Sequence, residues 1–260
     1  MHLLINLSVG GDIMNQLDLL VKKYNKIYKS EVQFDKKDNY FCLVQLIMGL
    51  LDVGNEDEAV LIINSYCLTL PEGEGKSILT LTALMYNHYK LFNLLNTLYE
   101  VDVNNNFIYN AIKYKADKII DGIIDDYNSF NINFSADNYS CIQRAILECN
   151  EMEYMQVFTS IMKLFLTRAK SLDFSKARMI YNCFMKDAIV ERKWYFLSFI
   201  ISFYGEICMR EKDGKQIMRE DFNKCVQSDL LFTLDSQEEI NQVLKEIKEV
   251  YVLNMYLDLE

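Results

Sequence analysis

The stretch Asp137-Asn138-Tyr139-Ser140-Cys141-Ile142-Gln143-Arg144-Ala145-Ile146 decides the fold, because a related stretch lies upstream at Asp38-Asn39-Tyr40-Phe41-Cys42-Leu43-Val44-Gln45-Leu46-Ile47. Both begin with Asp-Asn-Tyr, carry a cysteine two residues after the tyrosine and end in isoleucine. They start 99 residues apart, which is three times a period of about 33 residues, and periods of that size are typical of stacked structural repeats. Related segments at 105–112 and 78–83 place Ala111 and Ala83 in the position of Ala145. The sequence therefore predicts a repeat protein.

The composition favours helices and excludes two classes of partner. Hydrophobic residues make up 51% of the 260 residues, enough for a sizeable core, whereas one proline and nine glycines leave few turns for a β-rich fold. The net charge of −10 argues against binding to nucleic acid or to an anionic membrane surface, because both need a basic face. We predict an all-α protein with neither partner.

The cysteines and histidines indicate neither a metal site nor a disulfide framework. There are seven cysteines and two histidines, without a Cys-x-x-Cys pair or a Cys/His cluster. This pattern predicts buried, reduced thiols in the cytosol, and we expect no cofactor and no metal.

The apolar segments do not have the features of a signal peptide or a membrane span. The apolar start, 1–11, lacks the basic residues of a secretory signal. The longest apolar run, 194–205, is shorter than the ~18 residues that a membrane span requires. We predict a cytoplasmic protein, with delivery into a host cell as the alternative.

Apolar residues at three- and four-residue spacing predict helices in pairs along most of the chain. The predicted pairs are 41–51 with 58–66, 77–86 with 89–99, 107–114 with 117–127, and 140–147 with 152–166. Between them, the connectors 101–104 and 130–133 are predicted to be extended and are 29 residues apart. Beyond residue 167 two further helices are predicted at 174–185 and 194–204, but the repeat register is lost.

The C-terminal region predicts a capped amphipathic helix. Ser236 and Glu239 have the spacing of a capping box, and apolar residues follow at helical spacing from 240 to 251. Terminal repeats need a polar outer face, so we interpret this region as a cap, with a partner-binding helix as the alternative. We predict a repeat stack over residues 1–205 and a C-terminal helical cap over residues 206–260.

The repeated stretch resembles the ankyrin repeat, in which an Asp-Gly turn leads into a Thr-Pro-Leu-His-x-Ala helix. Asp137-Asn138 stands at the turn, Ser140 at the threonine, Ile142 at the leucine and Ala145 at the alanine. Asp102-Val103-Asn104 matches the connector that closes the ankyrin unit. The resemblance implies a solenoid of stacked helix-turn-helix repeats and covers residues 1 to 166 best.

The chain also departs from the ankyrin pattern. It contains no Thr-Pro-Leu-His tetrapeptide, Phe41 replaces the threonine in one repeat, and the repeats differ in length. These departures predict a divergent, irregular stack. A tetratricopeptide-like scaffold is the alternative fold, because Gly54, Ala59 and Pro71 fit that pattern once.

One segment, Gly75-Lys76-Ser77, has the ending of a phosphate-binding P-loop. Leu70 occupies the first glycine position of that motif, Glu72 and Glu74 would repel phosphate, and no strand is predicted before it. A nucleotide-dependent enzyme using Lys76 is therefore the alternative to our prediction that the protein is not an enzyme.

The ankyrin resemblance implies a monomeric module that binds a partner protein on the concave face of its first helices and connectors. The repeat register places five residues on that face: Tyr40, Tyr86, Lys113, Tyr114 and Tyr139. Tyrosine is enriched at interfaces because it combines a large apolar area with one hydrogen-bonding group. The alternative is that these tyrosines are packing residues of the core.

Overall fold

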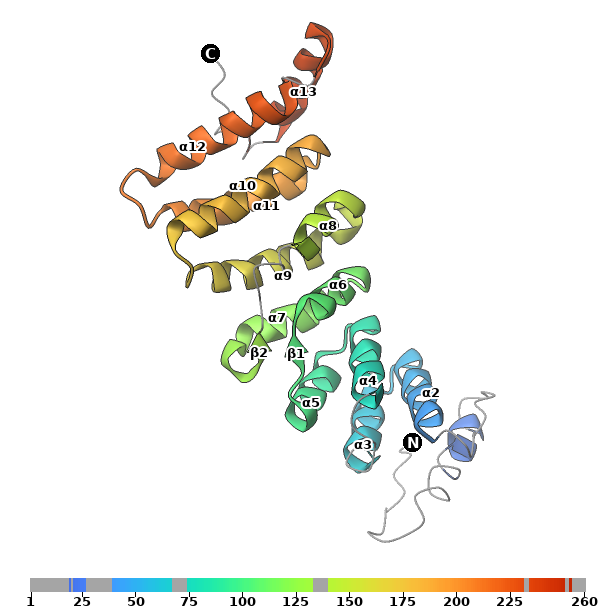
Figure 1. Ribbon diagram of the computed structural model, residues 1–260. Helices are drawn as coiled ribbons and strands as arrows, with labels where there is room; N and C mark the ends of the chain where they lie inside the picture. The colour runs from blue at the N-terminus through green and yellow to red at the C-terminus, as the bar shows by residue number, and fades with distance from the viewer. Residues whose placement is uncertain are drawn as a thin grey trace. The chain divides into compact units, whose positions relative to one another are not determined.

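The computed structural model describes residues 19, 21–26, 39–66, 74–132, 140–231, 234–250 and 253. In this part of the chain the structure is helical apart from two short strands, which confirms the predicted all-α class (Figure 1). The chain divides into two compact units, Met1–Val101 and Asp102–Glu260, and each is described by itself. The predicted division after residue 205 falls inside a helix of the second unit, Trp194–Cys208.

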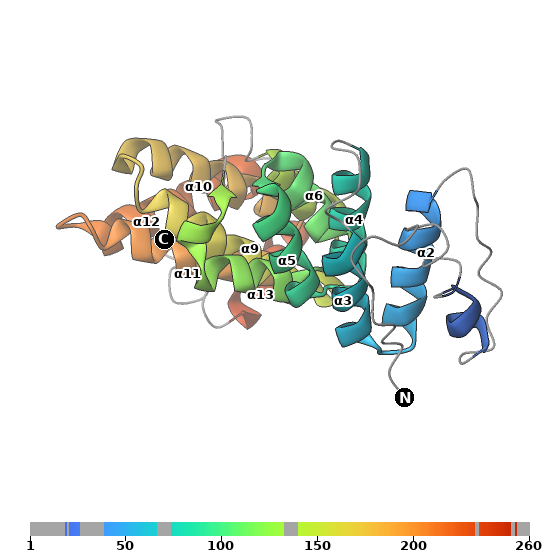
Figure 2. The same ribbon diagram turned by 90° about the horizontal axis from the view of Figure 1, so that it is seen from below.

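The described part of the first unit contains a short helical segment at 21–26 and two helix pairs. The pairs are α2 (Asn39–Asp52) with α3 (Glu56–Tyr66), and α4 (Glu74–Met85) with α5 (Tyr89–Tyr99). The first helices of the two pairs, α2 and α4, lie side by side (Figures 1 and 2), and the second helices, α3 and α5, also contact each other. Leu46, Ile47 and Leu50 of the strongly apolar α2 are completely buried. Contacts of first with first and second with second helices are typical of stacked repeats.

The second unit also consists largely of helix pairs and contains two short strands. Its elements are β1 (Asp102–Val103), α6 (Asn105–Lys113), α7 (Asp117–Asp125), η2 (Tyr127–Ser129), β2 (Asn131–Ile132), α8 (Ser140–Glu148), α9 (Glu151–Ala169), α10 (Phe174–Val190), α11 (Trp194–Cys208), α12 (Gly214–Cys225), the π-helical η4 (Val226–Leu230) and α13 (Gln237–Glu249). The first helices α6, α8 and α10 and then α12 follow one another as successive layers (Figure 1), and α7, α9 and α11 also pack in that order.

A backbone residue in the left-handed conformation ends the first helix of four pairs. These residues are Gly54, Asn87, Lys115 and Arg192, with φ values of 72°, 49°, 54° and 53°. The residue that follows each of them donates its N–H to the carbonyl five residues earlier, at 2.8–3.0 Å. This is the Schellman ending of a helix, which satisfies a carbonyl that would otherwise lack a partner. The same local geometry therefore turns the chain from first helix to second in both units.

The carbonyls that accept these hydrogen bonds belong to small or apolar buried residues. They are the carbonyls of Leu50, Ala83, Ala111 and Ala188, whose side chains are all completely buried. The predicted register placed Ala83, Ala111 and Ala145 at equivalent positions. Ala83 and Ala111 share this hydrogen bond with Ala188, whereas the Ala145 carbonyl accepts from the Cys149 N–H, four residues later, at 3.0 Å. We expect the small side chain of alanine at this point to allow neighbouring first helices to approach closely.

The two connectors are extended, as predicted, and the structure shows that they pair with each other. β1 and β2 form a parallel two-stranded sheet in which Asp102 lies opposite Asn131 and Val103 opposite Ile132. Directly after β1, the Asn104 side chain accepts a hydrogen bond of 3.1 Å from the Phe107 N–H and so begins α6. Successive connectors are thus in register, one repeat apart.

Side-chain hydrogen bonds also join neighbouring first helices of the second unit. The Cys141 thiol of α8 donates to the Asn105 carbonyl of α6, 36 residues away, at 3.2 Å. The Gln143 amide of α8 donates to the Asp187 carboxylate of α10, 44 residues away, at 2.8 Å. The sequence separation of the contacts between neighbouring first helices is therefore larger between α8 and α10 than between α6 and α8.

Longer helices cause this larger separation and explain why a period near 33 residues cannot be followed past residue 167. The helices α6, α7 and α8 contain nine residues each, whereas α9, α10 and α11 contain 19, 17 and 15. The helices predicted at 174–185 and 194–204 are confirmed. They belong to a further pair whose period is longer, so a constant-period search does not align it.

The C-terminal helix α13 begins at the predicted cap. The Ser236 hydroxyl accepts a hydrogen bond of 3.2 Å from the Glu239 N–H, and Val243 and Ile247 are completely buried. The Trp194 indole N–H at the start of α11 donates to the Glu246 carboxylate at 3.1 Å. The capped amphipathic helix is confirmed, and its role as a solubilising cap remains a prediction.

Replacing Ala111 with leucine should lower the free energy of unfolding by about 1–3 kcal/mol, because the added side chain would overpack a completely buried position. Urea denaturation followed by circular dichroism measures this change. The matched control is Lys113→Leu, an exposed position in the same helix, which should shift stability by less than ~0.5 kcal/mol. Equal stability of the two variants would contradict the close approach at Ala111.

Candidate functional site

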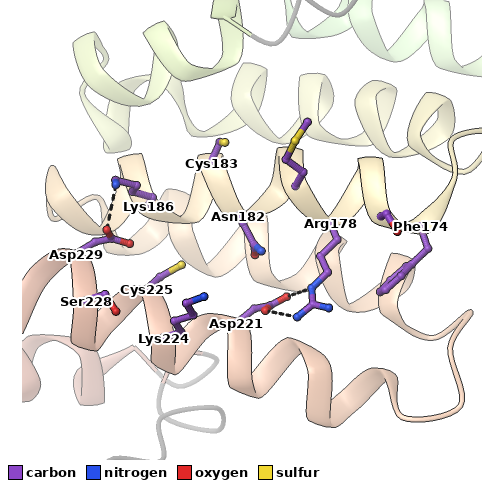
Figure 3. Close-up of a pocket in the computed structure, with 12 residues that line it drawn as sticks. Phe174, Arg178, Asn182, Cys183, Lys186, Asp221, Lys224, Cys225, Ser228 and Asp229 are labelled. Carbon is purple, nitrogen blue, oxygen red and sulfur yellow. Dashed lines mark hydrogen bonds and ion pairs between the residues drawn. The ribbon is translucent and has the colours of Figure 1, made fainter.

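A groove of about 640 Å³ lies between α10 and α12 in the second unit (Figure 3). One wall is the face of α10 that carries Arg178 and Lys186, and the other is formed by α12 and η4, which contribute Asp221, Lys224 and Asp229. Ligand sites in proteins usually have volumes of roughly 300–1,000 Å³, so this groove has an adequate size.

A buried carboxylate anchors one end of the groove. The Arg178 guanidinium donates through Nε to Oδ2 of Asp221 at 2.8 Å and through Nη2 to Oδ1 at 2.7 Å. The Tyr204 hydroxyl of α11 donates to the same Oδ2 at 2.6 Å. Asp221 is only 5% exposed, and three charge-assisted hydrogen bonds offset the cost of burying its charge.

The groups around Asp221 have shifted pKa values that follow from these contacts. The hydrogen bond to the carboxylate raises the pKa of Arg178 above its usual range. Burial, and then the hydrogen bond to Asp221, raises the pKa of Tyr204. Both side chains therefore keep their protons over the physiological pH range, which keeps all three hydrogen bonds intact.

A second ion pair closes the other end of the groove. The Lys186 ammonium lies 3.0 Å from Oδ1 of Asp229, and the hydrogen bond raises the pKa of Lys186. Asp229 belongs to η4, and π-helical turns occur frequently at functional sites. Lys186 and Asp229 are 43 residues apart, the same separation as Arg178 and Asp221. This constant separation means that α12 runs in the same direction as α10, as a further first helix would.

Polar side chains line the groove between the two ion pairs. Asn182 points from α10 toward α12, and Lys224 lies between Cys225 and Asp221 on the opposite wall (Figure 3). The side-chain oxygen of Asn182 is buried without a hydrogen-bond partner. Lys224 is exposed and forms no ion pair with any described carboxylate. The centre of the groove thus holds polar groups with unused hydrogen-bonding capacity.

The thiols at the groove do not resemble catalytic nucleophiles. Burial raises the pKa of Cys225 to about 12, so this thiol stays protonated at neutral pH and reacts poorly. Cys183 is exposed, which differs from the expectation of buried thiols, and it points away from α12 (Figure 3). The arrangement of the groove residues therefore suits binding of a ligand better than covalent chemistry.

In the first unit, the predicted binding residue Tyr86 has an internal partner. It lies in the turn after α4, and its hydroxyl donates at 2.8 Å to the Asp52 carboxylate at the end of α2. Burial, and then this hydrogen bond, raises the pKa of Tyr86 to about 12. Tyr40 was predicted on the connector before the helix, whereas it lies in the first turn of α2, and its side chain lies outside the described residues.

In the second unit, two predicted binding residues lie next to each other. Lys113 is the exposed last residue of α6, and its ammonium lies 5.3 Å from the ring centroid of the half-buried Tyr114. This distance suits a cation–π interaction. Tyr139 lies outside the described residues. Tyr86 belongs to the other unit, so whether all five residues share one face stays a prediction.

The segment predicted as an alternative phosphate-binding loop lies at the start of a helix. Because α4 begins at Glu74, Gly75, Lys76 and Ser77 belong to its first turn. The preceding described element is the helix α3, whereas a P-loop follows a β-strand. Residues 67–73 and the Lys76 side chain lie outside the described residues.

Sequence reasoning did not find the groove, although one signal was present. Arg178 and Lys186 are eight residues apart, and so are Asp221 and Asp229. Eight residues are roughly two helical turns, so each pair of charges lies on one face of its helix. Recognising that these faces meet requires the 43-residue period of this region, which differs from the period near 33 that the N-terminal repeats indicated.

Comparisons with protein-family models, with curated proteins and with solved structures find no match for this chain. Within the described ranges, no helix combines the length and apolar character needed to cross a membrane, and the apolar α11 has 15 residues. The described histidine, cysteine and acidic residues do not form a group of three or more that could hold a metal ion.

Replacing Tyr204 with phenylalanine should lower the free energy of unfolding by about 1.5–3 kcal/mol, because the buried Asp221 carboxylate would lose a hydrogen bond. Thermal and urea denaturation measure the loss. Tyr195→Phe in the same helix is the matched control, since Tyr195 is 52% exposed, and it should change stability by less than ~0.5 kcal/mol. A Tyr204→Phe variant as stable as the control would refute the network.

Proposed function

We propose that the protein is a non-enzymatic protein-binding module built on divergent ankyrin-like repeats. The observation that carries the proposal is the recurrence of one local unit: a first helix, a left-handed turn and a second helix. The parallel pairing of β1 with β2 at successive connectors adds support. Such stacks generally use their first helices and connectors to hold other proteins.

Exposed side chains on the first helices of the second unit support a binding surface there. Lys113, Leu147 and Val190 each lie two residues after one of the aligned alanines, at the ends of α6, α8 and α10. Leu147 is 46% exposed and Val190 is 49% exposed. Because α6 contacts α8 and α8 contacts α10, we place these residues in one column, which we call the first-helix column. Exposed apolar groups beside polar ones are typical of protein interfaces.

We also expect two of the predicted tyrosines to contribute to this binding surface. Tyr114 follows Lys113 directly and is half-buried, so part of its ring remains available to a partner. Tyr86 occupies the corresponding place after α4, although its hydroxyl is engaged by Asp52. We therefore expect Tyr114 to contribute more to binding than Tyr86.

The double variant Leu147→Asp with Val190→Asp should abolish capture of the partner from an extract of the source cell or its host, since it replaces both apolar side chains of the first-helix column with charged ones. Mass spectrometry of captured proteins, compared with wild type, measures the loss. The control is Met209→Asp, which alters a 64% exposed residue just after the second helix α11 and should retain the partner. Melting temperatures of all three proteins should agree within a few degrees. Loss of capture in the control as well would contradict a surface on the first helices.

The alternative, a nucleotide-dependent enzyme, makes a different prediction. In isothermal titration calorimetry, ATP with Mg²⁺ should give no saturable binding to the wild-type protein. A phosphate-binding P-loop follows a β-strand, whereas the described element before Lys76 is the helix α3. The Lys76→Ala variant should behave like wild type. Saturable binding that is lost in Lys76→Ala would replace the binding-module proposal with the enzyme.

A further inference from the structure

The groove between α10 and α12 has more hydrogen-bond donors than its internal ion pairs use. A guanidinium has five N–H donors, and Arg178 directs two of them to Asp221. An ammonium has three, and Lys186 is paired with one carboxylate, Asp229. Lys224 has no carboxylate partner within the described part of the chain. What the groove offers to a ligand is therefore mainly donors.

The charges of the groove are unbalanced by one. Three cations, Arg178, Lys186 and Lys224, face two carboxylates, Asp221 and Asp229. Both carboxylates are occupied by their own cations, and Asp221 also accepts from Tyr204. The unbalanced positive charge is that of Lys224, near the centre of the groove (Figure 3). A ligand that brings one negative charge would restore neutrality.

The rim of the groove adds an apolar contact. Met179 lies one residue after Arg178 on α10 and is 60% exposed, although it lines the groove. Methionine is flexible and polarisable, and it is common on surfaces that bind varied apolar side chains. The groove thus combines one free cation site with a neighbouring adaptable apolar surface.

We propose that this groove binds an acidic side chain of a partner polypeptide, with Lys224 as its ion-pair partner and Met179 in contact with an apolar neighbour of that acid. The proposal rests on the protein-binding function and names the chemistry of one part of the partner.

A peptide carboxylate fits the groove better than a phosphate. Phosphate recognition favours a free arginine fork, and the fork of Arg178 is already occupied by Asp221. The net charge of −10 would also repel an extended polyanion such as nucleic acid. A single carboxylate needs one compensating cation and gains the contact with Met179 when its neighbour is apolar.

Selection of a random displayed peptide library on the full-length protein tests the proposal. The enriched peptides should contain Asp or Glu next to an apolar residue. A synthetic copy of the best peptide should bind Lys224→Gln roughly tenfold more weakly than wild type, the loss expected for one charge-assisted hydrogen bond. Lys215→Gln is the matched control: it lies on the same helix, is exposed and is outside the lining of the groove, and it should bind like wild type.

A double-mutant cycle identifies the contact. Replacing the acid of the peptide with its amide should weaken binding to wild type as much as Lys224→Gln does, and combining both changes should cause no further loss. Additive losses would overturn the assigned ion pair, as would a library that enriches no peptide. If inorganic phosphate displaces the peptide at equal concentration, the groove binds small anions in general, and the proposal of a peptide ligand is wrong.

These outcomes also distinguish the proposal for the α10–α12 groove from the general proposal that the protein binds other proteins. Peptides that bind equally well to wild type and to Lys224→Gln would overturn the groove while leaving a protein-binding function in place. If Leu147→Asp with Val190→Asp still captures the partner, the first-helix column is not the binding surface. That result concerns other residues, so the double-mutant cycle would still decide whether Lys224 pairs with the peptide acid.

Discussion

The turn between the two helices of each pair is the constraint on which the rest of the structure depends. A helix that ends inside a protein leaves carbonyls without partners, and burying them unsatisfied would cost more than a typical side-chain contact returns. The hydrogen bonds to the carbonyls of Ala83, Ala111 and Ala188 solve this problem by reversing the chain within a few residues. The second helix then packs against the first, and each pair presents an apolar surface to the next.

Local features of the sequence predicted the helices and their caps well, because local chemistry determines them. The extended connectors and the cap at Ser236 both depend on residues close together in the chain, and both occur in the structure. The position of Tyr40 was missed because helix starts depend on weak end effects. The partner of Tyr86, Asp52, was missed because it lies one repeat away, 34 residues earlier.

The α10–α12 groove could not be predicted for a different physical reason. It depends on side chains that meet only when two helices are aligned 43 residues apart, and the N-terminal repeats give no indication of that separation. The helices of this region are longer than those of the preceding pairs. Side chains far from the turns therefore contribute more of the contacts between neighbouring helix pairs. The buried Asp221 carboxylate shows the consequence, since its described partners are side chains of two other helices, Arg178 of α10 and Tyr204 of α11.

The modest sequence separation of these contacts bears on how the second unit folds. The hydrogen bonds that join its successive first helices link residues 36 to 44 positions apart, so no large loop must close before a pair can dock on its neighbour. In such arrays nucleation is possible at several pairs, and structure then spreads to the adjacent ones. Folding of this unit should therefore be fast for its length, and a local defect should fray the nearest pair before it affects the others.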